Sequence, residues 1–68
     1  MSPLRAYREK KNLSQEELAA LLGVSRQMVG MLETGERQFT AEMAVNIEAK
    51  TGMNRVLFRP DLFRKKAA

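Results

Sequence analysis

The stretch "SRQMVGMLETGE", residues 25–36, places polar and apolar side chains at a helical spacing. Successive residues lie 100° apart on a helix, so Val29 and Leu32 share one face. The opposite face holds Arg26, Gln27, Gly30 and Met31. Arginine can pair bidentately with guanine and glutamine with adenine, each good pair contributing about 1 to 3 kcal/mol of discrimination, and an apolar side chain can touch a thymine methyl. This face therefore suits the reading of base edges, although a solvated helix face is the alternative interpretation.

Two short helices must position these side chains. "SQEE" is a capping box in which Ser14 caps a helix and Glu17 reaches back to the Ser14 N–H. The pattern predicts that this helix ends at Gly23, where a left-handed residue is tolerated. Ser25 then caps a helix over 26–33, which Gly35 closes. Two helices joined by a three-residue turn containing glycine describe a helix-turn-helix unit over 14–33.

Three more elements are expected around this unit. Ser2 and Pro3 open a helix over about 3–11, since proline is favoured at the first helical position. Thr40 caps a helix that runs to residue 50 or 51, with Gly52 as its stop. Asn54 caps a short fifth turn, "RVLF". The chain is therefore expected to be all-α, a compact bundle of about five short helices.

Residues 4–36, "LRAYREKKNLSQEELAALLGVSRQMVGMLETGE", resemble the Cro/CI-type helix-turn-helix family of DNA-binding regulators, which has the lambda-repressor-like fold. The similarity lies in the combination LSQEELA, LGVS and LE.G, and it continues more loosely through the fourth helix. The positions that must be apolar in the motif are all filled: Leu18, Leu22, Val24, Val29 and Leu32. The position of tight helix contact holds Ala19 and the turn holds Gly23.

The resemblance implies a set of double-stranded DNA contacts. Ser14 and Gln15 would grip a phosphate at one helix N-terminus, and Ser25 lies at the N-terminus of the next, where unpaired N–H groups favour an anion. Arg26 and Gln27 would read bases, with Gly30 and Met31 on the same face. Arg37 and Gln38 lie in the following loop, where family members often meet the DNA backbone. The resemblance also implies a partly buried ion pair between Arg8 and Glu33, with a structural role.

Gly30 and Glu36 depart from the family pattern. A glycine inside a helix costs about 1 kcal/mol relative to alanine. Either DNA approaches the helix backbone closely at Gly30, or the face with Arg26, Gln27, Gly30 and Met31 has lost its ability to read DNA. Glu36 places a negative charge in a loop where a positive charge would favour phosphate.

The composition limits the possible chemistry. The chain of 68 residues suits one small domain, and it contains no cysteine and no histidine. The commonest nucleophiles, general bases and zinc ligands are therefore missing, so we expect no enzyme, no metal site and no cofactor. The chain has no apolar run long enough to cross a membrane and no secretory leader, which predicts a cytoplasmic protein.

The net charge of +4 is concentrated at the two ends of the chain. Residues 1–11 and 59–68 each carry four basic residues and one acidic residue. An anionic partner is one interpretation and simple solubility is the other. We expect a helix-turn-helix domain over 1–58 and a basic C-terminal tail over 59–68, which either follows DNA phosphates or only aids solubility.

Residues 54–63 contain more apolar side chains than a thin core readily absorbs. They either form a homodimer contact or cover the helical core. The leading functional hypothesis is a dimeric Cro-like repressor on a palindromic operator. The alternatives are a DNA-binding antitoxin that autoregulates its operon and covers a toxin, and a protein-interaction adaptor that does not bind DNA.

Overall fold

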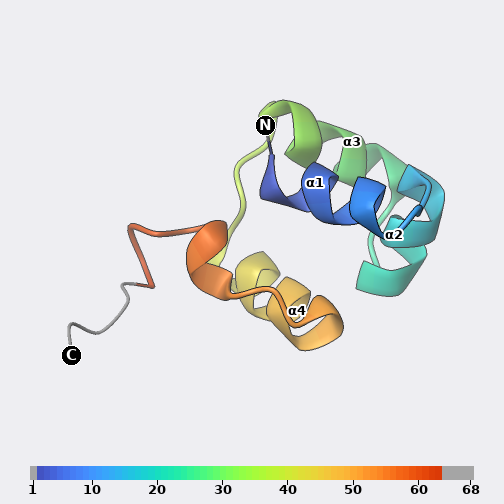
Figure 1. Ribbon diagram of the computed structural model, residues 1–68. Coiled ribbons are helices and arrows are strands. Elements are labelled where there is room, and N and C mark those ends of the chain that lie inside the picture. The colour runs from blue at the N-terminus through green and yellow to red at the C-terminus, as the bar shows by residue number, and fades with distance from the viewer. Residues whose placement is uncertain (1, 64–68) are drawn as a thin grey trace. The chain divides into compact units, whose positions relative to one another are not determined.

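The computed structural model describes residues 2–63 and is all-helical over that range. Its elements, which Figure 1 shows in chain order, are α1 (Pro3–Lys10), α2 (Gln15–Leu22), α3 (Arg26–Thr34), α4 (Ala41–Thr51) and the 3₁₀ helix η1 (Arg55–Leu57). The expected all-α class is confirmed. The described part of the chain has four α-helices instead of about five, because the last element is a single 3₁₀ turn. Pro60 follows closely and disfavours helical geometry at the residue before it.

Each α-helix begins at a hydroxyl side chain, as the sequence predicts. The caps are Ser2, Ser14, Ser25 and Thr40, and each hydroxyl oxygen accepts a hydrogen bond from a first-turn backbone N–H. Helices α2, α3 and α4 all end at a glycine in the left-handed region. The helix boundaries thus follow from local capping chemistry.

The chain divides into two units, of which the first is Met1–Gln38. Within it α2 packs against α3, and α1 also contacts α3 (Figure 1). The buried side chains of this unit are all apolar: Leu4, Leu18, Ala19, Leu22, Val29 and Leu32. Gly23 makes the tight turn between α2 and α3 with a φ of +74°. The resulting core holds α3 with its apolar face inward.

The second unit is Phe39–Ala68, described as far as residue 63. In it η1 packs against α4, and the buried side chains are Ala44, Ile47 and Phe58. The rings of Phe39 and Phe58 lie with centroids 4.8 Å apart. The Arg59 guanidinium donates from Nη1 to the Phe39 carbonyl at 2.8 Å and pairs with the Asp61 carboxylate. These contacts connect the two ends of the described part of this unit.

The apolar side chains of residues 54–63 take different environments. Phe58 is buried in the second unit, whereas Leu57 and Leu62 are 53% and 50% exposed. Arg64, Lys65 and Lys66, which carry most of the charge of the expected tail, lie outside the described residues. No helix among the described residues is long and apolar enough to cross a membrane.

Candidate nucleic-acid interface

The N-terminal turn of α3 presents two polar side chains to solvent. Arg26 and Gln27 are exposed, while Val29 is fully buried and Leu32 nearly so. Ser25 caps the helix, and its Oγ accepts from the Met28 N–H at 3.0 Å. The other first-turn N–H groups have no partner within the helix and carry its positive dipole end. One end of α3 therefore combines hydrogen-bonding side chains with a site suited to an anion.

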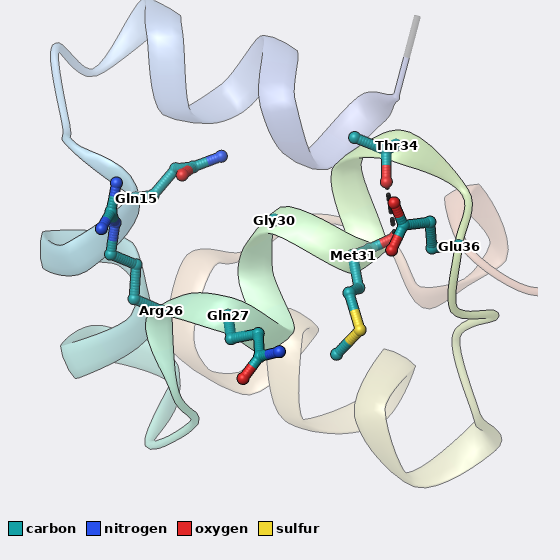
Figure 2. Close-up of a pocket in the computed structure, with 7 residues that line it drawn as sticks. All are labelled: Gln15, Arg26, Gln27, Gly30, Met31, Thr34 and Glu36. Carbon is teal, nitrogen blue, oxygen red and sulfur yellow. Dashed lines mark hydrogen bonds between the residues drawn. The ribbon is translucent and has the colours of Figure 1, made fainter.

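The exposed face of α3 forms one wall of an open hollow, shown in Figure 2. Its lining consists of Gln15, Arg26, Gln27, Gly30, Met31, Thr34 and Glu36. Thus Gln15 from α2 comes together with the four residues that the sequence groups on one face of α3. Arg26 and Gln27 occupy the N-terminal end of α3 in the figure, and Met31 lies one turn further along.

Gly30 lies at the hollow within a regular helix, and its φ is not positive. A Cβ atom built at this position would have only one near neighbour, Nε2 of Gln15 at 3.9 Å, which is an ordinary van der Waals distance. The fold of the first unit therefore has no steric need for glycine here. The two explanations that remain for Gly30 both concern a ligand face and not the core.

Some polar groups at the N-terminus of α2 are already hydrogen-bonded within the capping box. The Ser14 N–H donates to Glu17 Oε1 at 2.8 Å, and Ser14 Oγ accepts from the Glu17 N–H at 3.0 Å. The Ser14 hydroxyl hydrogen and the Gln15 backbone N–H have no intrahelical acceptor. Two acidic residues in this turn, Glu16 and Glu17, offset part of the attraction of the helix end for an anion.

Arg8, Glu33 and Gln15 form a hydrogen-bonded group that joins all three helices of the first unit. Arg8 donates to the Glu33 carboxylate from Nε at 2.6 Å and from Nη2 at 3.1 Å, and Gln15 Nε2 donates to Glu33 Oε1 at 3.1 Å. The side chains of Arg8 and Glu33 are only 16% and 4% exposed. Such a bidentate pair, shielded from water, fixes the orientation of both groups.

This environment shifts the pKa of both members of the ion pair. Desolvation by burial raises the pKa of Glu33, but the hydrogen bonds from Arg8 and Gln15 and the nearby positive charges outweigh it. The pKa of the Glu33 carboxyl therefore lies below its ordinary value of 4.5. The hydrogen bond to Glu33 raises the pKa of the Arg8 guanidinium. The pair is fully ionised at neutral pH.

The loop after α3 holds Arg37 and Gln38, for which the sequence predicts contacts with the DNA backbone. Arg37 and Gln38 are exposed and do not line the hollow, although the Arg37 N–H donates to the Met31 carbonyl at 3.2 Å. Thr34, which sequence reasoning missed, lines the hollow, as does Glu36, which the sequence singled out only as a negative charge in the loop. The Thr34 hydroxyl donates to the Met31 carbonyl at 3.3 Å (Figure 2). Since Thr34 lies four residues after Gly30, its helical spacing was the available signal.

Comparison with known proteins adds one finding to this geometry. A family model described as helix-turn-helix, of the Cro/CI type, matches residues 4–58. The matched segment includes α1 from its second residue, α2 to α4, η1 and every residue of the hollow. No curated protein and no solved structure matches the chain.

Proposed function

Because the chain belongs to the Cro/CI-type helix-turn-helix family of DNA-binding regulators, we propose that it is a dimeric repressor that binds a palindromic operator. The observation that carries this proposal is the exposed face of α3, where Arg26 and Gln27 line an open hollow together with Gly30. A helix of this kind fits the major groove of B-DNA. Family members are regulatory domains and are not typically enzymes.

We assign roles in base reading to the side chains on this face. Arg26 pairs with guanine O6 and N7, and Gln27 pairs with adenine N6 and N7, each contributing about 1 to 3 kcal/mol of discrimination. Met31, half-buried at the hollow, contacts a thymine methyl. Gly30 lets the DNA come close to the helix backbone.

Phosphate contacts fix the position of the protein on the duplex and carry little sequence information. We assign them to the helix N-termini, with Ser14 and Gln15 at α2 and Ser25 at α3. Arg37 and Gln38, both exposed after α3, extend this set along the DNA backbone.

Dimerisation gives the operator its symmetry. Two copies of α3 would read half-sites about 34 Å apart, which is one turn of DNA. Residues 54–63 supply the contact in this proposal, since Leu57 and Leu62 leave half of their surface exposed. Repression follows from occupancy, because a bound dimer excludes polymerase once the protein has accumulated.

A second candidate function is a DNA-binding antitoxin. In the second unit an apolar groove runs beside α4 and is lined by Ala41, Val45, Ala49 and Phe63, together with two polar residues. With Leu57 and Leu62, this groove offers apolar surface to a protein partner such as a toxin. Both candidate functions use α3 to bind DNA. They differ in what binds the apolar surface of the second unit, which is a second copy of the chain for the repressor and a toxin for the antitoxin.

The experiment that tests the proposal is selection of binding sites from a random duplex library by the purified protein. Wild type is expected to enrich a palindrome, and Arg26→Ala or Gln27→Ala is expected to relax the preference at defined bases. Arg5→Ala is the matched control, because Arg5 also carries an exposed positive charge but does not line the hollow. Weak binding with no enriched sequence, unchanged by the α3 substitutions, would contradict the operator proposal and favour an adaptor that does not bind DNA.

A further inference from the structure

The side chain of Gln15 belongs to two structural groups at once. It lines the hollow beside α3, and its Nε2 donates to Glu33 Oε1 at 3.1 Å. The same carboxylate oxygen also accepts from Arg8 Nη2 at 3.1 Å, and the other oxygen accepts from Arg8 Nε at 2.6 Å. The candidate DNA-contacting surface is therefore connected directly to the ion pair.

Arg8 is itself anchored at a third point. Its Nη1 donates to the Leu13 carbonyl at 3.0 Å, directly before the Ser14 cap of α2. The guanidinium is planar and rigid, so three fixed acceptors leave it a single orientation. Glu33 is held between this guanidinium and Gln15 with only 4% of its side chain exposed. The carboxylate cannot turn without losing at least one charge-assisted hydrogen bond.

A fixed carboxylate determines the orientation of the glutamine amide. A carboxylate only accepts hydrogen bonds, so the NH₂ group of Gln15 must face it, and the alternative flip would bring two oxygens together. One N–H of Nε2 is used by Glu33, which leaves the second N–H and the Oε1 atom for a ligand. Ordering the side chain before binding removes part of the entropy cost that the complex would otherwise bear.

We propose that the Arg8–Glu33 ion pair is a positioning device for Gln15, which holds the glutamine amide ready for contact with DNA. This inference rests on the proposed function, because it supposes that the surface with Gln15 meets DNA. It extends the role of the ion pair beyond the stability of the helix-turn-helix unit. Arg8 and Glu33 act through Gln15 and do not contact DNA themselves.

The sign of the Glu33→Gln effect separates this role from simple electrostatics. Removing a negative charge from a DNA-binding protein strengthens its attraction to phosphates. A positioning role predicts the opposite, because the variant's amide offers one acceptor oxygen where the carboxylate offered two, so the donors of Arg8 and Gln15 are no longer all held and the Gln15 amide loses its fixed orientation. A purely structural role changes the free energy of unfolding and leaves the affinity of the folded protein unaltered.

The test is a double-mutant cycle in DNA affinity with Gln15→Ala, Glu33→Gln and the double variant. The probe is the duplex that wild type enriches from a random library. We expect each single variant to bind about tenfold more weakly, as for loss of a hydrogen bond to a charged group. The double variant should bind no more weakly than Gln15→Ala alone. Glu9→Gln is the control, because it removes an exposed carboxylate of α1 that is hydrogen-bonded to Arg5 and that acts on Arg8 through its charge alone, with no hydrogen bond to Gln15 within residues 2–63.

Circular dichroism at the binding temperature identifies any variant that does not fold. If Glu33→Gln is unfolded, Arg8→Lys replaces it in the cycle, since it keeps the charge but loses the fork of donors. The proposal is overturned if Glu33→Gln binds the duplex as tightly as wild type or more tightly. The same outcome for Arg8→Lys overturns it where that variant is used instead. It is also overturned if the substitution weakens binding just as much in a protein that already carries Gln15→Ala. If the wild-type protein enriches no duplex, both the proposed function and this positioning role are overturned.

Discussion

Nε2 of Gln15 lies 3.9 Å from the position that a Cβ atom would occupy on Gly30. This distance leaves room for a methyl group, so the contact between α2 and α3 does not explain the glycine. Packing within the first unit therefore does not offset the free-energy cost of a glycine in the middle of α3. The explanation for Gly30 must therefore be either that a ligand approaches the helix backbone at the hollow or that this face no longer binds a ligand.

Gly30→Ala is expected to raise the free energy of unfolding by about 1 kcal/mol, because alanine is the better helix former and meets no clash here. Urea unfolding measures this change. DNA affinity is expected to fall, because the added methyl group occupies the space between α3 and the duplex. Higher stability with unchanged affinity would instead favour a recognition face that has decayed.

Gly23→Ala should have the opposite effect on stability. Gly23 has a φ of +74°, which an L-residue with a side chain adopts at a cost of about 1 kcal/mol or more. We expect a lower midpoint in the same urea experiment, although no atom lies within 4 Å of the added Cβ. A neutral result would show that the turn relaxes at little cost.

Stability should fall with acid partly through Glu33. Its folded-state pKa is lower than the ordinary 4.5, so the carboxylate contributes stability above that pH and loses it as the pH falls through the folded-state value. Urea unfolding of wild type and Glu33→Gln at pH 7 and pH 3 measures this contribution. The two proteins should differ more at pH 7 than at pH 3. An equal difference at both pH values would contradict the ionised pair.

Asp61 provides a separate test in the second unit. The hydrogen bond from Arg59 lowers the pKa of Asp61 from 3.8 to about 2. An NMR titration of the Asp61 carboxyl should find this value in wild type. In Arg59→Gln the pKa should return toward 3.8, because the charged donor is lost. A value near 3.8 in wild type would mean that the pair does not persist in solution.

Leu57 and Leu62 are the expected centre of the dimer contact. Changing both to glutamate should leave a folded monomer, because each leucine is about half exposed and contributes little to the core. Sedimentation equilibrium measures the change, and operator binding should require more protein. Leu21→Glu is the control, since Leu21 is also exposed, at 39%, but lies in the first unit. Dimers that survive the double change would move the contact elsewhere.

The helix starts and stops could be predicted from sequence because the chemistry is local. Ser14, Glu17 and Gly23 act on backbone groups within a few residues, so their types and spacing suffice. The grouping of Arg26, Gln27, Gly30 and Met31 follows in the same way from the periodicity of one helix.

Other features depend on packing between distant residues. The bond between Gln15 and Glu33 joins residues 18 positions apart and requires α2 and α3 to be placed against each other. Periodicity also did not separate Phe58, which is buried, from its exposed neighbour Leu57, because the last helix is a single turn. The pairing of Arg8 with Glu33 entered the sequence interpretation through family resemblance, since no local spacing indicates it.

The small apolar core has a consequence for the turnover of the protein in a cell. Nine hydrophobic side chains are buried among the described residues, and the sequence contains no cysteine for a covalent cross-link. A ligand that binds only the folded state adds about 2.7 kcal/mol of stability at 100 times its dissociation constant. By this principle, copies that are not bound to DNA would unfold more often and be degraded sooner than bound copies. Occupancy of DNA and survival of the protein would therefore be coupled, and the proteins that persist would be those already on their sites.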